Sequence, residues 1–314
     1  MDGLSRLVRM ARLECEVDVR CLIAGRFTVE NAASAPGRVP FHLVLDGRST
    51  LTAGPITTEM GPGDLVLLPH GDAHQVTAIG GSRHPLAKVP GAAFSTLRTV
   101  GPEPELDLFC GHYRFQQPGP GSVLFRLMPP LVQVSLDPVA QQLATMLRDE
   151  TCFDGPGTGA IVSALCDALL AMALRSSPDR RLGTPALWTA MGDDSLGLAI
   201  AGVVDRPGEA WTIDRLAAEA RMSRATFMRR FTSRTGTTPA ALLTAIRMMV
   251  AADLLTRSET SITRIVEDVG YRSPSAFGRA FREAFGTSPI AYRRGRSQSR
   301  GAEVEEPAQA SSRP

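Results

Sequence analysis

The chain has 314 residues, of which 43% are hydrophobic and 21% are charged, and its formal net charge is +2. This length allows two or three domains with an ample hydrophobic core. Because the chain contains no run of eighteen apolar residues, and its first residues lack the hydrophobic region of a signal peptide, we expect a cytoplasmic protein without a membrane span.

The first part of the chain, residues 1–136, has the pattern of a β-rich domain. A short amphipathic helix is predicted over residues 4–13. Apolar and polar residues then alternate over residues 16–23, 41–45 and 106–115. Glycine and proline interrupt these runs about every ten residues, which is typical of the short strands of a β-sandwich or barrel. Residues 90–104 hold several glycines and prolines, and we expect them to form a loop over the mouth of the barrel.

One motif indicates the type of barrel. Gly63, Pro69, Gly71 and His74 stand at the spacing G-x5-P-x-G-x2-H, which resembles the second conserved motif of cupins, the small double-sheet barrels. The resemblance implies that the proline and the second glycine shape a turn, and that His74 begins the next strand and points into the barrel. The first cupin motif, with its H-x-H pair and glutamate, is not evident, and His42 stands alone near where that motif would lie.

Four side chains able to bind a metal gather in this region. His70 and His74 stand four residues apart across a turn, while Cys110 and His112 stand two apart on a predicted strand and so face the same side. One cysteine and three histidines could bind zinc or another divalent metal. The alternative is that His74 and His112 are hydrogen-bonded barrel residues, His70 is exposed, and Cys110 is a small core residue.

The five cysteines form no C-x-x-C pair, and their odd count in a cytosolic chain indicates free thiols rather than a disulfide framework. Cys110 or Cys21 could serve as a redox-sensing thiol whose pKa is lowered by nearby histidines. The alternative is a buried cysteine with a structural role only.

Residues 137–192 are expected to form a helical segment after the barrel. Its first helix begins at Asp137 and Pro138. One apolar stripe of that helix is formed by Val139, Leu143, Met146 and Leu147. A second helix, rich in alanine and leucine, is predicted over residues 158–174, and residues 176–183 have the composition of a linker. The two helices pack against the barrel or form a homodimer contact, and both can hold at once.

Residues 193–296 contain a duplicated module. The spacing F-x3-F-x4-G-x2-P occurs at Phe227, Phe231, Gly236 and Pro239 and again at Phe277, Phe281, Gly286 and Pro289. An amphipathic segment precedes each copy, at residues 213–220 and 262–269, so each unit has the pattern helix, tight turn, helix. Hydroxyl side chains stand where each helix needs an N-cap, at Thr212, Ser223, Ser261 and Ser273.

The second helix of each unit has one apolar side and one polar side. At 100° per residue, Arg229 and Arg279 occupy the same place in the two copies and project away from the phenylalanines. An arginine there can grip guanine in a major groove. Predicted base-contact residues are Ala225, Met228, Arg229, Ser275 and Arg279, and predicted phosphate-contact residues are Ser223, Arg224, Arg230, Arg234, Ser273 and Arg282. The alternative is a solvated charged face. Residues 193–296 hold 16 arginines against 11 acidic residues, a net charge of +5 that suits DNA binding.

On these residues the stretch from Ser195 to Arg294 resembles the DNA-binding domain of AraC/XylS-type transcriptional regulators, most densely over Ile265 to Arg294. The resemblance implies two helix-turn-helix units joined by a central helix over residues 240–256, which dock in successive major grooves of double-stranded DNA. It also implies a homodimer formed through the helices at residues 137–192, contact with RNA polymerase, and a cupin-like domain that receives the signal.

The sequence therefore predicts a multidomain α+β protein: a cupin-like double-sheet barrel at residues 1–136, a helical segment at 137–192, an all-α tandem helix-turn-helix domain at 193–296, and a disordered tail at 297–314. We expect a transcription factor rather than an enzyme. Its signal is a small molecule, a metal or an oxidant, and the effector is otherwise unknown. The alternative is a metal-dependent cupin enzyme joined to a DNA-binding domain, which the missing H-x-H pair and glutamate disfavour.

Overall fold

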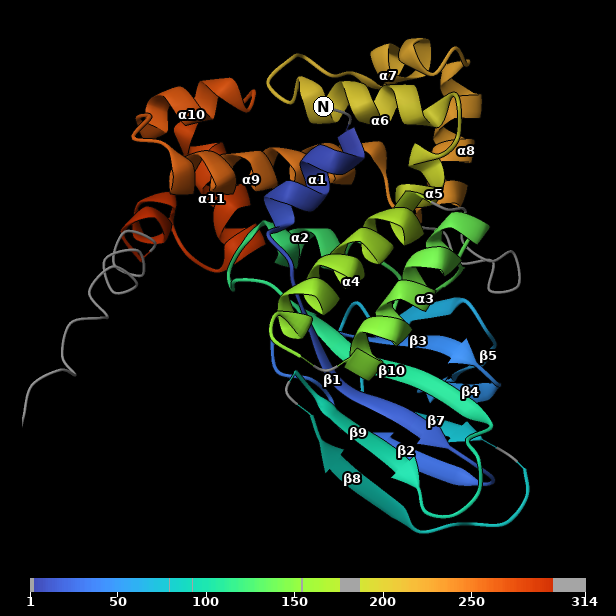
Figure 1. The fold of residues 1–314 in the computed structure, drawn as a ribbon. Helices are drawn as coiled ribbons and strands as arrows, with labels where there is room; N and C mark the ends of the chain where they lie inside the picture. The colour runs from blue at the N-terminus through green and yellow to red at the C-terminus, as the bar shows by residue number, and fades with distance from the viewer. Residues whose placement is uncertain (1–2, 79, 92, 154, 176–186, 296–314) are drawn as a thin grey trace, which may run out of the picture.

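The computed structural model describes residues 3–78, 80–91, 93–153, 155–175 and 187–295 and contains a β-rich domain packed against a helical one (Figure 1). The expected α+β organisation is confirmed. The predicted linker at residues 176–183 and the predicted tail at residues 297–314 lie outside the described residues.

The β-rich domain consists of two sheets that face each other. Its strands are β1 (Glu14–Ile23), β2 (Phe27–Asn31), β3 (Arg38–Asp46), β4 (Ser49–Ala53), β5 (Ile56–Met60), β6 (Asp64–Leu67), β7 (His74–Ala78), β8 (Leu86–Pro90), β9 (Ser95–Thr99), β10 (Leu106–Arg114) and β11 (Val132–Ser135). The larger sheet has the order β11-β6-β3-β10-β1-β9-β8, and the smaller one has the order β2-β7-β4-β5. The predicted loop at residues 90–104 is wrong in part, because β9 pairs there with β1 and β8.

The larger sheet is covered on both faces, which explains why β10 is buried along nearly its whole length. Leu108 and Cys21 face the smaller sheet and pack with its apolar residues. Phe109 and Tyr113 face the other way, where the Tyr113 hydroxyl donates to the Cys166 carbonyl at 2.8 Å. Alternation along β10 therefore separates a barrel interior from a surface that carries helices.

Helices α3 (Pro138–Phe153) and α4 (Thr158–Arg175) lie on that outer face of the larger sheet (Figure 1). The first begins as expected, since an Asp137 side-chain oxygen accepts from the backbone N–H of Ala140 at 2.8 Å. Its predicted apolar stripe is partly wrong. Leu147 is buried, but Val139 and Met146 are 60% and 55% exposed. The face that packs against β3 and α4 instead carries the small side chains of Ala140 and Ala144, which let the helix lie close to them.

The helical domain follows the expected plan. Its helices are α5 (Leu187–Met191), α6 (Leu196–Asp205), α7 (Ile213–Glu219), α8 (Arg224–Thr235), α9 (Pro239–Arg257), α10 (Ile262–Asp268) and α11 (Pro274–Phe285). Helix α9 is the predicted central helix, and Leu242, Ile246, Met249 and Val250 on it are buried. Leu254 is only half-buried. By length and composition α4 and α9 could each cross a membrane, but core helices pass the same test, and both pack inside this fold.

The two domains meet through α1 (Gly3–Ala11) and α2 (Pro120–Arg126). The first lies against α6 and α9, and the second lies against α9 (Figure 1). Polar contacts accompany this packing: Arg12 lies 3.4 Å from Asp253, and Arg126 donates to the carbonyl of Ala284 at 3.1 Å. Because β1 begins three residues after α1 ends, the barrel is connected directly to a helix that touches the helical domain.

Candidate nucleic-acid interface and sensor site

Local side-chain contacts explain where the helices of both helix-turn-helix units begin and end. All four predicted N-caps are confirmed: in each case the hydroxyl of Thr212, Ser223, Ser261 or Ser273 accepts from the backbone N–H three residues on. Gly236 and Gly286 end α8 and α11 in the left-handed region, at φ of 69° and 71°. In the turn between the helices, Gly270 has φ 77° in the second unit, whereas Arg221 takes φ 54° in the first.

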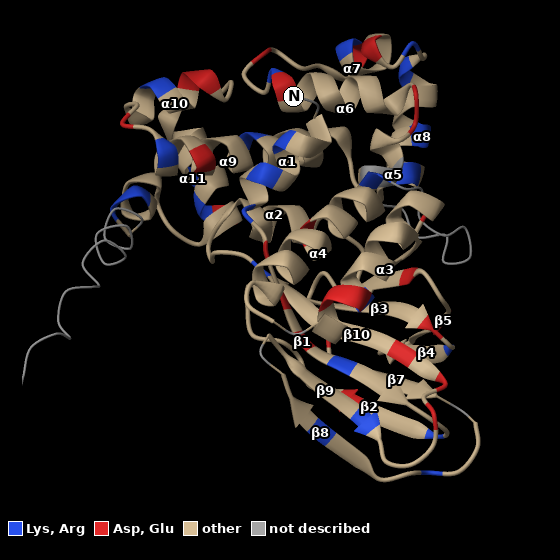
Figure 2. Ribbon diagram, in the orientation of Figure 1, with Lys and Arg blue, Asp and Glu red and all other residues tan. Residues whose placement is uncertain are grey.

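The expected two-sidedness of α8 and α11 is present. Phe227, Phe231, Phe277 and Phe281 are all at most 2% exposed. The predicted DNA-contact residues Ala225, Arg229, Ser275, Arg279, Ser223, Arg224, Arg230, Arg234, Ser273 and Arg282 are all exposed. Met228 is the exception, because it is half-buried and packs against the core. Figure 2 shows basic residues on both helices.

The arginines on these helices are not equally available. Within the described part of the chain, no side-chain hydrogen bond or ion pair holds Arg229 or Arg279. Arg230 instead lies 2.6 Å from Asp193, whose side chain also accepts from the backbone N–H groups of Ser195 and Leu196. Burial opposes ionisation of Asp193, but these backbone hydrogen bonds and Arg230 together lower its pKa. A phosphate contact by Arg230 therefore has to compete with this ion pair.

Inside the barrel, four ionisable side chains form a continuous contact. Cys110 on β10 stands directly opposite His42 on β3, and His42 Nδ1 lies 3.1 Å from Cys110 Sγ. His42 Nε2 lies 2.8 Å from Nε2 of His74, which comes from the smaller sheet, and His74 Nδ1 lies 2.9 Å from the Asp72 carbonyl oxygen. Cys21 lies on the neighbouring strand β1, diagonally across from Cys110, because Cys21 pairs with Leu108 and Cys110 pairs with Val19. The ionisation of each of these two thiols is influenced by the other. We call these four residues the thiol–imidazole cluster.

Burial dominates the ionisation of this cluster. Desolvation, and then the neighbouring His74, lowers the pKa of His42 to about 3. Burial also lowers the pKa of His74, although its hydrogen bond to the Asp72 carbonyl opposes the effect. The interaction with Cys110 lowers the pKa of Cys21, and the pKa of Cys110 is raised by its interaction with Cys21 and by burial. The thiol pair therefore gives up its first proton more readily than its second.

The predicted metal ligands are not brought together. His70 is exposed in the turn before β7. His112 is buried, but its Nδ1 lies 2.9 Å from Asp18 and its Nε2 lies 3.2 Å from Glu16. Among the described residues, no group of three or more histidine, cysteine or acidic side chains could hold a metal ion. Binding of zinc or another divalent metal stays a prediction for which these four residues, as placed, form no site.

His42 is the member of the cluster that the sequence motifs missed. The signal for it was the alternation along β3, which places Val44 and His42 on the same side of the strand, facing the interior of the barrel. The sequence alone does not tell which strands lie beside β3, so it does not identify the neighbours of His42.

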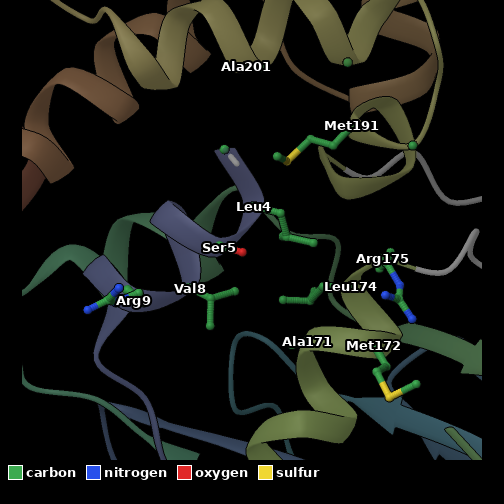
Figure 3. A pocket seen from close by; sticks show the side chains of 13 residues that line it. Leu4, Ser5, Val8, Arg9, Ala171, Met172, Leu174, Arg175, Met191 and Ala201 are labelled. Atoms are coloured by element: carbon green, nitrogen blue, oxygen red, sulfur yellow. The ribbon is translucent and has the colours of Figure 1, made fainter. Parts of the chain in front are cut away.

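A separate cavity of about 620 Å³ lies between the domains. It is a partly open pocket bordered by α1, α4, α5 and the start of α6. Figure 3 shows Leu4, Val8, Leu174 and Met191 pointing toward the space, with Arg9 and Arg175 at its edges. Most of its lining is apolar.

Two helix-turn-helix units with exposed arginines, joined to a barrel that encloses ionisable side chains, define a DNA-binding regulator with its own sensor domain. The chain matches a cupin family model over residues 2–178 and a helix-turn-helix domain model over residues 216–295. It belongs to the AraC-type transcriptional regulators with an N-terminal cupin domain, and it regulates transcription through sequence-specific binding to double-stranded DNA in response to a signal at that domain.

Relatives match over nearly the whole chain. An uncharacterized HTH-type transcriptional regulator of Haemophilus influenzae is 30% identical over 94% of this chain and 99% of its own length. The RCS-specific HTH-type transcriptional activator RclR of Escherichia coli is 28% identical over 93% of this chain and 97% of its own. Among solved structures, the DNA-binding domain of AdpA in complex with a target DNA is 36% identical, covering 36% of this chain and 100% of that one, with a TM-score of 0.33.

Replacing Arg279 or Arg229 by alanine is expected to weaken binding to the cognate DNA by about 1–3 kcal/mol and to relax preference at one base pair, because each can make a bidentate contact to guanine. Mobility-shift titrations against a library of single-base variants measure both effects. Arg98→Ala removes an exposed arginine from β9 of the barrel and serves as the control. Unchanged affinity and specificity in Arg279→Ala would show that α11 is placed wrongly on DNA.

Lowering the pH from 7.5 to 5 is expected to destabilise the protein. His42 binds a proton near pH 6.5 when unfolded but only near pH 3 when folded, so the unfolded state takes up more protons as the pH falls below 6.5. At pH 5 this histidine is expected to lower the free energy of unfolding by about 2 kcal/mol, and urea denaturation at the two pH values measures the change. A His42→Asn variant should lose correspondingly less stability over the same range, and an identical pH dependence in both proteins would contradict the assignment.

Proposed function

We propose that this regulator responds to oxidation of the Cys21–Cys110 thiol pair, and that it acts in the cytoplasm as a homodimer that contacts RNA polymerase. The observation that carries the proposal is the thiol–imidazole cluster inside the barrel: two interacting thiols on adjacent strands, with Cys110 in contact with His42 and His42 in contact with His74.

The chemistry of the pair suits a reversible oxidation. A thiolate is the reactive form of cysteine, and the lowered pKa of Cys21 favours it. A two-electron oxidant such as hydrogen peroxide removes two electrons and two protons from the pair, leaving one S–S bond and two molecules of water. Cellular thiols reverse the reaction, so the disulfide persists only while the oxidant does.

A route from the thiol pair to DNA runs along β1. A disulfide would pull the Cys21 segment of β1 toward β10. Because β1 follows directly on α1, and α1 packs against α6 and α9, a shift of β1 changes the surface on which the DNA-binding domain rests. The two domains then take up a different relative position, which alters how α8 and α11 reach successive grooves.

A small-molecule effector is the second candidate signal, and the interdomain cavity favours it. The cavity is large enough for a ligand of moderate size, and a ligand there would touch both α1 and the first helix of the DNA-binding domain. Catalysis is not part of the proposal. A metal-dependent cupin enzyme would turn over substrate when loaded with iron or manganese, and such turnover would overturn the view of this barrel as a sensor.

The homodimer is proposed to form through α3. Val139, Met146 and Phe153 are 60%, 55% and 70% exposed and stand seven residues apart, which is the spacing of an apolar seam between two paired helices. Exposed apolar side chains in such a row are stabilised when a second copy of the same helix covers them.

Hydrogen peroxide or hypochlorous acid is expected to change the affinity of the protein for its cognate DNA by about fivefold or more, the lower range of allosteric coupling. Cys21→Ser and Cys110→Ser should bind DNA but no longer respond. Cys152→Ser removes an exposed thiol outside the barrel and should respond like the parent. If the parent protein forms no Cys21–Cys110 disulfide and keeps its DNA affinity in oxidant, the proposed response to oxidation is wrong.

Met146→Glu is expected to convert the dimer into a monomer, because the apolar seam between the two copies would then have to bury two negative charges. Light scattering coupled to size-exclusion chromatography gives the mass. Thr145→Glu adds the same charge to an exposed position of α3 away from the stripe and should leave the dimer intact. A monomeric parent protein would rule out the α3 contact.

A further inference from the structure

The hydrogen bonds of the thiol–imidazole cluster have a determined direction. A carbonyl oxygen only accepts, so His74 Nδ1 must carry a proton and donate it to the Asp72 carbonyl. Since burial keeps His74 neutral, its Nε2 has no proton and accepts from His42 Nε2. His42 is also neutral, which leaves its Nδ1 with a lone pair aimed at Cys110 Sγ. The Cys110 thiol is therefore the donor to His42.

We infer that His42 and His74 form a proton relay that takes one proton from the Cys21–Cys110 pair when an oxidant reacts with it. The inference rests on the proposed oxidant response and adds two positioning residues to it. In the relay, the Cys110 proton passes to His42 Nδ1 while the His42 Nε2 proton passes to His74 Nε2. His42 changes tautomer but stays neutral, and the positive charge appears on His74.

The placement of the two histidines suits this division. His42 is 2% exposed and lies between the sheets, where a charge is costly. His74 stands at the first residue of β7, next to exposed Asp72 and Ala73 in the preceding turn, and its Nδ1–H already donates to a carbonyl, an arrangement that favours the charged ring. The charge therefore forms on His74, where a backbone carbonyl already accepts from the ring, and not on His42.

Other charges near the pair oppose loss of its proton. Asp18 on β1 and Asp107 on β10 place negative charge near the sulfurs. Asp18 contacts His112, and Asp107 is bound by Arg20 and lies 3.2 Å from Arg148, which partly offsets both. No cation touches the thiols directly among the described residues, so a nearby proton acceptor is the main means of forming a thiolate here.

The oxidation balances with the relay included. The sulfur that carries the charge attacks hydrogen peroxide, an S–O bond forms, the O–O bond breaks, and the departing hydroxide takes the proton back from His74 as water. The second sulfur then displaces hydroxide from the sulfenic acid, an S–S bond forms, and the remaining thiol proton leaves with that hydroxide as a second water. The relay lends one proton and recovers it.

The test measures the rate of Cys21–Cys110 disulfide formation in the full chain with hydrogen peroxide, between pH 5.5 and 9. His42→Asn keeps an oxygen able to accept from Cys110 but cannot take up a proton, and His74→Asn breaks the next step. Both are expected to react about tenfold more slowly at pH 7, with the half-maximal rate shifted upward by about one pH unit. His70→Asn, at an exposed histidine outside the cluster, should match the parent.

The outcomes separate the relay from the proposed signal. If both asparagine variants form the disulfide with the parental rate and pH profile, the relay is overturned and the oxidant response stands. If the parent forms no disulfide and its DNA affinity ignores oxidant, the response fails and the relay with it. Nitrogen-15 spectra of histidine in the reduced parent do not depend on the variants folding. They should show a proton on Nε2 of His42 and on Nδ1 of His74, and a proton on Nδ1 of His42 would overturn the relay.

Discussion

Burial of the apolar helix α9 is the constraint on which the helical domain and its contact with the barrel both depend. Helices from both helix-turn-helix units pack on α9, and so do α1 and α2 of the sensor domain. Arg247 extends this role with polar contacts, since it donates to the carbonyls of Pro207 and Glu209 and lies 5.7 Å from the Tyr271 ring centroid. The spacing between α8 and α11 is therefore set by one rigid element, and the sensor domain touches that same element.

Inside the barrel, the main constraint is that buried polar groups need partners. Its polar groups are stable there because each finds a partner: the two imidazoles bind each other, one thiol and one carbonyl. In a medium of low polarity such a chain is more strongly ordered than it would be in water, and removing one member leaves the others without partners. The same low polarity keeps the histidines neutral, which gives the chain a single direction of hydrogen bonding and makes it suitable for moving a proton.

The sensor and the DNA-binding domain are linked through contacts that are modest one by one. The Arg12–Asp253 and Arg6–Asp205 pairs are partly exposed and each contributes little to stability. The apolar packing of α1 and α2 on α6 and α9 supplies most of the attachment. An interface of this kind holds the domains together and still allows them to shift by small amounts, as a sensor that acts at a distance requires.

The sequence by itself determined the helix-turn-helix units, because their caps, phenylalanine spacing and glycine ends are local features read within a few residues. It also determined the barrel class, through the turn that precedes His74. Only the tertiary structure decided which side chains meet inside the barrel. His42 and Cys110 are 68 residues apart in the chain, and His74 reaches them from the other sheet, so strand pairing and sheet stacking chose these partners over His70 and His112. The exposed stripe of α3 was settled in the same way, because Val139 and Ala140 are both apolar and only the packing of the helix selects which one is covered.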